Sequence, residues 1–89
     1  MRAVVTVVGK DKTGIIARVS GLFYEKDVNI LDISQKLMQN VFTMISLVDL
    51  EKSSVDFDGL TKELEKVGEE LNVSINILPE DMFKNVHKD

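Results

Sequence analysis

The sequence predicts an α+β domain with the element order strand, helix, strand, strand, helix, strand. Two observations favour this fold. Short runs rich in β-branched or alternating apolar residues recur along the chain, as strands do. Two longer segments carry apolar residues at the spacing of amphipathic helices. The expected strands are 3–8, 30–38, 41–50 and 73–77. The expected helices are 14–26 and a second segment that starts near residue 54 or 56 and extends to about 71.

Length, composition and charge narrow the class of protein. The 89 residues suffice for one hydrophobic core, and eleven basic against fifteen acidic side chains give a net charge of −4, the wrong sign for nucleic-acid binding. No apolar run approaches the ~18 residues of a membrane span, and the chain starts without the apolar core of a signal peptide. There is no cysteine, and the one histidine, His87, cannot form a metal site alone. We therefore expect a soluble, cytoplasmic domain without a metal, cofactor, membrane or nucleic-acid partner.

The loop from Gly9 to Ile16 connects the first strand to the first helix. The strand before it, Ala3 to Val8, is continuously apolar except for one threonine, so it is expected to be buried on both faces. Glycines at both ends allow a sharp turn, and Thr13 stands where an N-cap is expected. The first amides of the helix lack intrahelical partners and point outward at its positive end. The loop therefore predicts a site for a small anion, a carboxylate or a phosphate.

The first helix is predicted to bury one apolar stripe, formed by Ile15, Ile16, Val19, Leu22 and Phe23. A mid-helix glycine, Gly21, costs about 1 kcal/mol relative to alanine, so either something packs closely there or a poor residue is tolerated. The segment 27–29 then ends the helix.

A hairpin is expected next, with Gln39-Asn40 as its two-residue turn. In the strand 30–38, Leu31, Ile33, Gln35 and Leu37 form a face that should be buried, while the other face is wet. The strand 41–50 is apolar on both faces, which indicates a central strand.

The second helix is expected to start near Ser54 or Asp56, with its charged residues forming a solvated face. Pro79 ends the last strand because proline cannot extend a ladder. Residues 1–79 are thus expected to form a single domain, and 80–89 a tail with a short helix.

This order is the split βαβ arrangement of the ferredoxin-like fold, a four-stranded antiparallel sheet in the order 4-1-3-2 with both helices on one face. The other face should then expose Val, Phe and Met side chains of the first and third strands, and strand 30–38 should be an unpaired edge. Both features predict self-association.

The motif Gly9-Lys10-Asp11-Lys12-Thr13-Gly14-Ile15-Ile16, with Val28-Asn29-Ile30 after the first helix, resembles the ACT domain, a small regulatory module of amino-acid metabolism. The likeness spans about residues 2–79 and is greatest to small one-domain proteins related to glycine-cleavage regulators. It implies that two copies pair side by side through the second strand and first helix, with an amino acid bound at the junction. The implied ligand-binding residues are Asp11, Thr13, Gly14, Ile15, Ile16 and Asn29.

In this resemblance the amides of Thr13 to Ile16 hold the ligand carboxylate, while Asp11 and Asn29 face its amino group, Asn29 from the same chain or from the partner. The chemistry agrees, since a helix start suits a carboxylate and Asp11 is a pure acceptor for an ammonium. Two departures are Thr13, where the family often has proline, and Asp11, where several binders have a neutral residue. Asp11 is alternatively an Asx-turn or capping residue, and Asn29 a turn residue in the left-handed region.

We expect no enzyme and no catalytic residue. Acylphosphatases share this topology but need an arginine in the first loop, where this chain has only the lysines Lys10 and Lys12, which either attract an anion or are simply solubilising. RNA recognition on this topology needs aromatic residues on the first and third strands, which here offer only Phe42. The function expected is a homodimeric module that binds an amino acid or similar small carboxylate. The alternative is a ligand-free dimerisation or protein-interaction module with an unknown protein partner.

Overall fold

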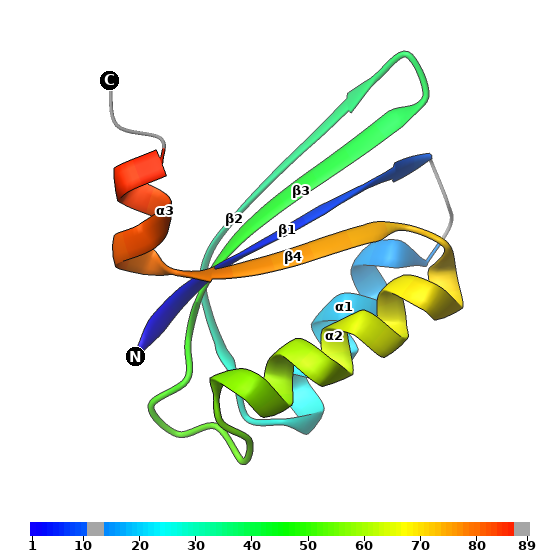
Figure 1. Ribbon diagram of the computed structural model, residues 1–89. Coiled ribbons are helices and arrows are strands. Elements are labelled where there is room, and N and C mark those ends of the chain that lie inside the picture. The colour runs from blue at the N-terminus through cyan, green and yellow to red at the C-terminus, as the bar shows by residue number, and fades with distance from the viewer. Residues whose placement is uncertain (11–13, 87–89) are drawn as a thin grey trace.

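The computed structural model describes residues 1–10 and 14–86, and these form one antiparallel sheet with helices on both of its sides (Figure 1). The elements are β1 (Arg2–Lys10), α1 (Ile15–Glu25), β2 (Asn29–Met38), β3 (Val41–Asp49), α2 (Phe57–Leu71), β4 (Ser74–Pro79) and α3 (Glu80–Val86). The strand order is β2-β3-β1-β4, and α1 and α2 cover one face. This is the predicted ferredoxin-like fold.

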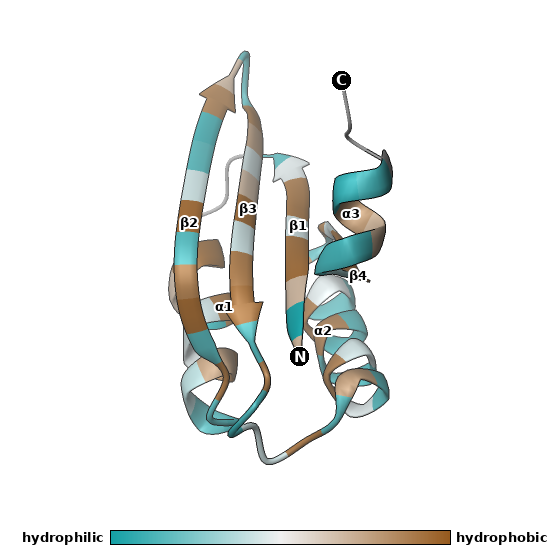
Figure 2. Cartoon of the chain, turned by 90° about the vertical axis from the view of Figure 1, so that its left-hand side faces the viewer, coloured by the Kyte–Doolittle hydropathy of each residue, from teal (hydrophilic) through white to brown (hydrophobic). Residues whose placement is uncertain are grey.

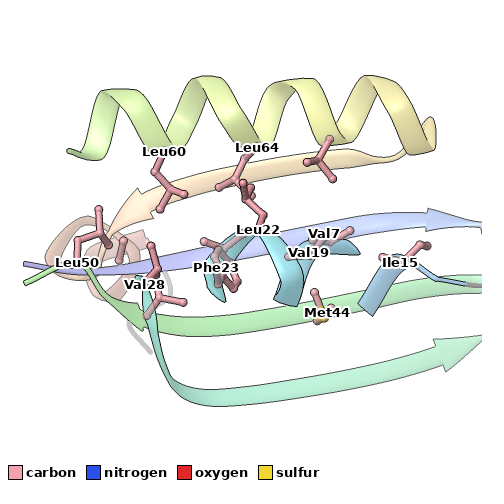
Figure 3. Close-up of a cluster of buried hydrophobic side chains, with 14 residues drawn as sticks. Val7, Ile15, Val19, Leu22, Phe23, Val28, Met44, Leu50, Leu60 and Leu64 are labelled. Atoms are coloured by element: carbon pink, nitrogen blue, oxygen red, sulfur yellow. The ribbon is translucent and has the colours of Figure 1, made fainter. Parts of the chain in front are cut away.

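The core lies between the sheet and the two longer helices (Figure 3). α1 contributes the buried side chains Ile15, Val19, Leu22 and Phe23, four of the five residues predicted for its apolar stripe. On the surface, the Arg18 guanidinium donates two hydrogen bonds to Glu70 of α2, at 3.0 and 3.2 Å. The hydrogen bonds to Glu70 raise the pKa of Arg18 above its ordinary value.

The side chains on the face opposite α1 and α2, which we call the outer face, differ from expectation. β3 pairs with β1 so that Phe42 and Met44 stand opposite Gly9 and Val7, and Met44 is fully buried beneath the helices. The expectation that Phe and Met lie on the outer face is therefore wrong, because the alternation along β3 turns both toward the helices. Val8 lies on the outer face and is exposed, so β1 is buried on both faces over only part of its length.

β2 is the edge strand, as predicted, and it joins β3 through Gln39 and Asn40, both at positive φ (49° and 71°), as a two-residue type I′ turn requires. Its expected buried face is not buried, since Ile33 is 38% and Leu37 57% exposed. The physical reason is that β2 has a neighbour on one side only and is longer than α1, whose 11 residues span about 16 Å. A register shift at Leu31 adds a bulge.

The C-terminal tail forms α3, the expected short helix, which follows β4 directly and contacts β1 and β4 (Figure 1). It projects from the outer face of the sheet. None of the helices in the described ranges is long and apolar enough to cross a membrane.

Candidate functional site

The start of α1 is the first part of the candidate site. The N-cap is Gly14, in the left-handed region with φ 92°, and not Thr13 as expected. A helix that starts on a residue of positive φ needs glycine there, and this moves its start one residue along the chain. Thr13 and Asp11, two of the predicted site residues, lie outside the described residues.

Among the described residues, the amides at the start of α1 have no carboxylate neighbour of the kind found at the starts of the other helices. α2 starts at Asp56, whose Oδ1 accepts a hydrogen bond from the Gly59 amide at 2.8 Å, and has Asp58 in its first turn. α3 has two acidic residues in its first turn. α1 has neither a capping side chain at Gly14 nor an acidic residue in its first turn. If only residues 1–10 and 14–86 are counted, the start of α1 has the least compensated positive charge of the three helix starts, which suits an external anion.

The two residues after Gly14 are both predicted site residues, and they face different ways. Ile15 is buried in the core, so the backbone that carries its amide is anchored. Ile16 was predicted to join the core stripe, but it is 39% exposed. Because α1 turns about 100° per residue, Ile16 lies on the flank away from Arg18, which faces α2. This places an apolar side chain on the exposed edge of the domain beside the helix start.

Asn29, the last predicted site residue, is exposed and is the first residue of β2. The turn before it is a Schellman motif, in which the Val28 amide donates to the Phe23 carbonyl at 2.9 Å and the Asp27 amide to the Tyr24 carbonyl at 3.2 Å. The left-handed residue of this motif is Asp27, with φ 57°. The alternative that Asn29 is a left-handed turn residue is therefore wrong, and its side chain is free of that role.

An open groove surrounds Asn29, with a volume of about 770 Å³. Three carboxylates and one lysine line it, together with Tyr24, which is 85% exposed. The groove is therefore acidic. Its lining residues are Tyr24, Asp27, Val28, Asn29, Asp49, Glu51 and Lys52.

The two parts of the site lie at opposite ends of α1. Gly14 precedes its first residue and Asn29 follows its last turn, so about 16 Å of helix separates them. In Figure 1, α1 begins at the end of the sheet where β1 finishes, and β2 begins at the other end. One chain alone therefore does not bring Asn29 to the amides of Gly14, Ile15 and Ile16.

Sequence reasoning missed the special role of Asp27, although the sequence carried a signal for it. α2 ends in the same motif, with Asn72 at φ 56° and the Val73 amide donating to the Gly68 carbonyl. In both halves of the chain an Asp or Asn is followed by Val and then by the first residue of a strand. This repeated pattern locates the left-handed residue two positions before Asn29.

Comparisons with known proteins agree on one family. The sequence profile described as ACT domain matches residues 2–77. A UPF0237 protein of Methanocaldococcus jannaschii is 53% identical over 98% of this chain and 97% of its own length. An ACT domain protein from Streptococcus pneumoniae is 46% identical, with a TM-score of 0.82 over 94% of both chains. A candidate glycine cleavage system transcriptional repressor shares the fold, at 22% identity and a TM-score of 0.72 over 86% of this chain and 44% of that one.

Proposed function

Because this chain belongs to the ACT domain family of regulatory small-molecule-binding modules, we propose that it binds an amino acid or a similar small carboxylate as a homodimer. In this dimer two β2 edges pair antiparallel and the two α1 helices lie side by side; we call it the edge dimer. The ligand carboxylate binds the amides of Gly14, Ile15 and Ile16, and its ammonium group faces Asn29 of the partner and Asp11. We further propose that the protein is cytoplasmic and has no enzymatic activity.

The observation that carries this proposal is the start of α1. Its glycine N-cap offers amides without a capping side chain, while α2 caps its own start with Asp56. A carboxylate at a helix start gains both hydrogen bonds and a favourable dipole interaction. An amino-acid carboxylate has the size and charge to fill that position.

The separation of the two parts of the site supports an edge dimer. When two β2 strands pair antiparallel, the start of β2 in one subunit lies beside the end of β2 in the other. The sheet end at which β2 finishes is also the one that carries the β1–α1 loop. Asn29 of one subunit then approaches Gly14 of the other, which no arrangement of one chain achieves. The exposed apolar residues Ile16, Ile33 and Leu37 lie on α1 and β2, along the edge that this pairing covers.

The charges along this edge also favour antiparallel pairing. The groove at Asn29 carries the carboxylates of Asp27, Asp49 and Glu51. The other end carries the exposed Lys10, followed in the sequence by Asp11 and Lys12, so these three residues have a net charge of +1. Antiparallel pairing places the acidic end of each subunit against the basic end of its partner, whereas parallel pairing would oppose like charges.

The test is an amide NMR titration of the protein with pools of amino acids at millimolar concentration. We expect shifts confined to residues 11–16 and Asn29, and splitting the pools then identifies the ligand. Asn29→Ala should weaken binding roughly tenfold, because it removes a hydrogen bond to a charged group. Asn85→Ala, a change at an exposed asparagine on α3, is the matched control and should leave binding unchanged.

A complementation experiment tests whether the site is shared between subunits. Asp11→Ala and Asn29→Ala homodimers should each lose affinity at both sites. A mixed dimer of the two variants regains one intact site, so half of the binding capacity returns at native affinity. No recovery in a proven mixed dimer would mean that Asp11 and Asn29 serve the same subunit. Absence of any shift with an intact dimer would favour the alternative, a ligand-free dimerisation or protein-interaction module.

A further inference from the structure

The outer face of the sheet is only partly covered by the chain itself. α3 projects from it beside β4, while β2, β3 and the adjoining part of β1 lie open (Figure 2). The strand register arranges the outward side chains in rows across these strands. We call the following residues the outer strip: Asp32, Leu47 and Val4; Ser34, Ile45 and Thr6; Lys36, Thr43 and Val8; Met38, Val41 and Lys10.

Half of the twelve residues of the outer strip are apolar, and four of these six are exposed. Val8 and Ile45 are each 38% exposed, and Val41 and Met38 are exposed further along the same face. These side chains come from three neighbouring strands, so they form one patch and not scattered single residues. Contiguous exposed apolar patches of this kind mark interaction surfaces.

The strip continues into a groove beside α3. Its volume is about 240 Å³, and its surface is mainly apolar with charged groups at the rim. Because α3 stands on one side of the strip, this surface is concave along that side. The groove is lined by Val4, Asp32, Ser34, Ile45, Leu47, Glu80, Phe83 and Lys84.

The outer strip lacks the excess of acidic residues found in the chain as a whole. It contains one acidic residue, Asp32, and two basic residues, Lys36 and Lys10, so its net charge is +1 on a chain of net charge −4. Asp32 and Lys36 are four positions apart on one strand, about 13 Å, which is too far for them to pair with each other. Neither has an ion-pair partner among the described residues. The same surface on a second copy offers each of them an opposite charge without the repulsion that the rest of the acidic surface imposes.

The area of the strip indicates how many copies meet. The outer strip is three strands wide and extends from the row of Asp32 to the row of Met38. Its flat area is therefore roughly 300 Å², well below the ~800 Å² per partner of a standard interface. In the edge dimer the two β2 strands adjoin, so two outer strips form one continuous surface of roughly 600 Å². The relief of the side chains and the flanks of α3 increase it further. At roughly 600 Å² per partner, the contact between two edge dimers reaches the lower end of the range of stable interfaces, whereas the contact between two single chains does not.

We propose that the outer strips of two edge dimers pack face to face, as two sheets do in a β-sandwich, and form a dimer of dimers. This proposal rests on the edge dimer of the proposed function. The occupant of the outer strip is thus a second copy of the same surface, with Ile45 near the centre of the contact.

The test is sedimentation velocity over a range of protein concentrations, with one variant for each surface. The chain has a mass of 10.0 kDa, so we expect the unmodified protein at four times this mass. Ile45→Glu and Ile45→Lys should both halve it, because either charge is unfavourable in the apolar centre of the strip. Ile33→Glu, on the opposite side of β2, should disrupt the edge dimer. Lys62→Gln on the exposed side of α2 lowers the net charge by one unit, as Ile45→Glu does, and should leave the mass unchanged.

The outcomes separate this inference from the proposed function. If the unmodified protein is a dimer that both Ile45 variants leave intact but that Ile33→Glu dissociates, the face-to-face contact is overturned and the edge dimer is supported. A native dimer that dissociates with either Ile45 variant but not with Ile33→Glu would place a contact on the outer strip but overturn the edge dimer, and with it the dimer of dimers. A monomer at all concentrations would overturn both. Far-UV circular dichroism of each variant establishes that a change in mass does not come from unfolding.

Discussion

Two glycines of the first helix should respond to the same substitution with opposite sign. A Cβ at either Gly14 or Gly21 meets no atom of the described residues within 4 Å, so no clash with them contributes. Gly14 has φ 92°, and an alanine held in the left-handed region costs roughly 1–2 kcal/mol. Gly21 lies within α1, where alanine is favoured over glycine by roughly 0.5–1 kcal/mol. Both substitutions restrict the unfolded chain similarly, so the difference of about 1.5–3 kcal/mol reports the native backbone.

Urea unfolding of Gly14→Ala, Gly21→Ala and the unmodified protein at one fixed protein concentration measures this difference. We expect the midpoint to fall for Gly14→Ala and to rise for Gly21→Ala, with unchanged slopes. By thermal unfolding, each 1 kcal/mol corresponds to roughly 4–8 °C for a domain of this size. If Gly14→Ala were as stable as the unmodified protein, the left-handed N-cap, and with it the assigned start of α1, would be wrong. A loss of stability in Gly21→Ala would instead place Gly21 in close contact with another subunit.

Two further substitutions test the packing of the sheet. Ser46→Ala should raise the free energy of unfolding by about 1 kcal/mol, because the Ser46 hydroxyl is fully buried with no hydrogen-bond partner in the described part of the chain. The control is Ser53→Ala, which should lower the free energy of unfolding because the Ser53 Oγ accepts a hydrogen bond from the Val55 amide. If Ser46→Ala were less stable than the unmodified protein, the Ser46 hydroxyl would have a hydrogen-bond partner after all. Gly9→Ala should cost roughly 1–3 kcal/mol, because its Cβ would approach Val73 Cγ1 to 2.5 Å. Chemical denaturation of Gly9→Ala in a Val73→Ala background checks this, since an unreduced penalty there would exclude the clash as its cause.

The sequence was sufficient for the fold because its local signals agree with one another. The spacing of Leu60, Leu64 and Val67 identified α2, and Asp56 capped it as one of the two expected starts. The turn at Gln39 and Asn40 also followed from local chemistry. In each case neighbouring residues determine the conformation, so no knowledge of the rest of the chain was needed.

The errors occurred where distant parts of the chain decide. Ile16 and Ile33 have the hydrophobicity of core residues, but the element order leaves both on an edge without a neighbour. The face on which Phe42 lies depends on its pairing with β1, which periodicity alone does not determine. The N-cap is Gly14 and not Thr13, because the positive φ of Gly14 depends on how the preceding chain joins the helix. Two of these residues, Ile16 and Gly14, belong to the candidate site, so the least predictable positions gather near it.

A ligand that binds between subunits would regulate assembly without any change within a subunit. In the proposed edge dimer, one small molecule binds Gly14 of one subunit through its carboxylate and Asn29 of the partner through its ammonium group. A single chain therefore binds only one end of this ligand. Such a ligand binds the dimer and not the monomer, so by linkage it stabilises the dimer by about 2.7 kcal/mol per site when its concentration is a hundred times its Kd. Two equivalent sites would double this effect. The ligand concentration then determines the fraction of chains that form the edge dimer. Because the face-to-face contact needs two adjoining outer strips, the fraction of tetramer should also rise with ligand concentration.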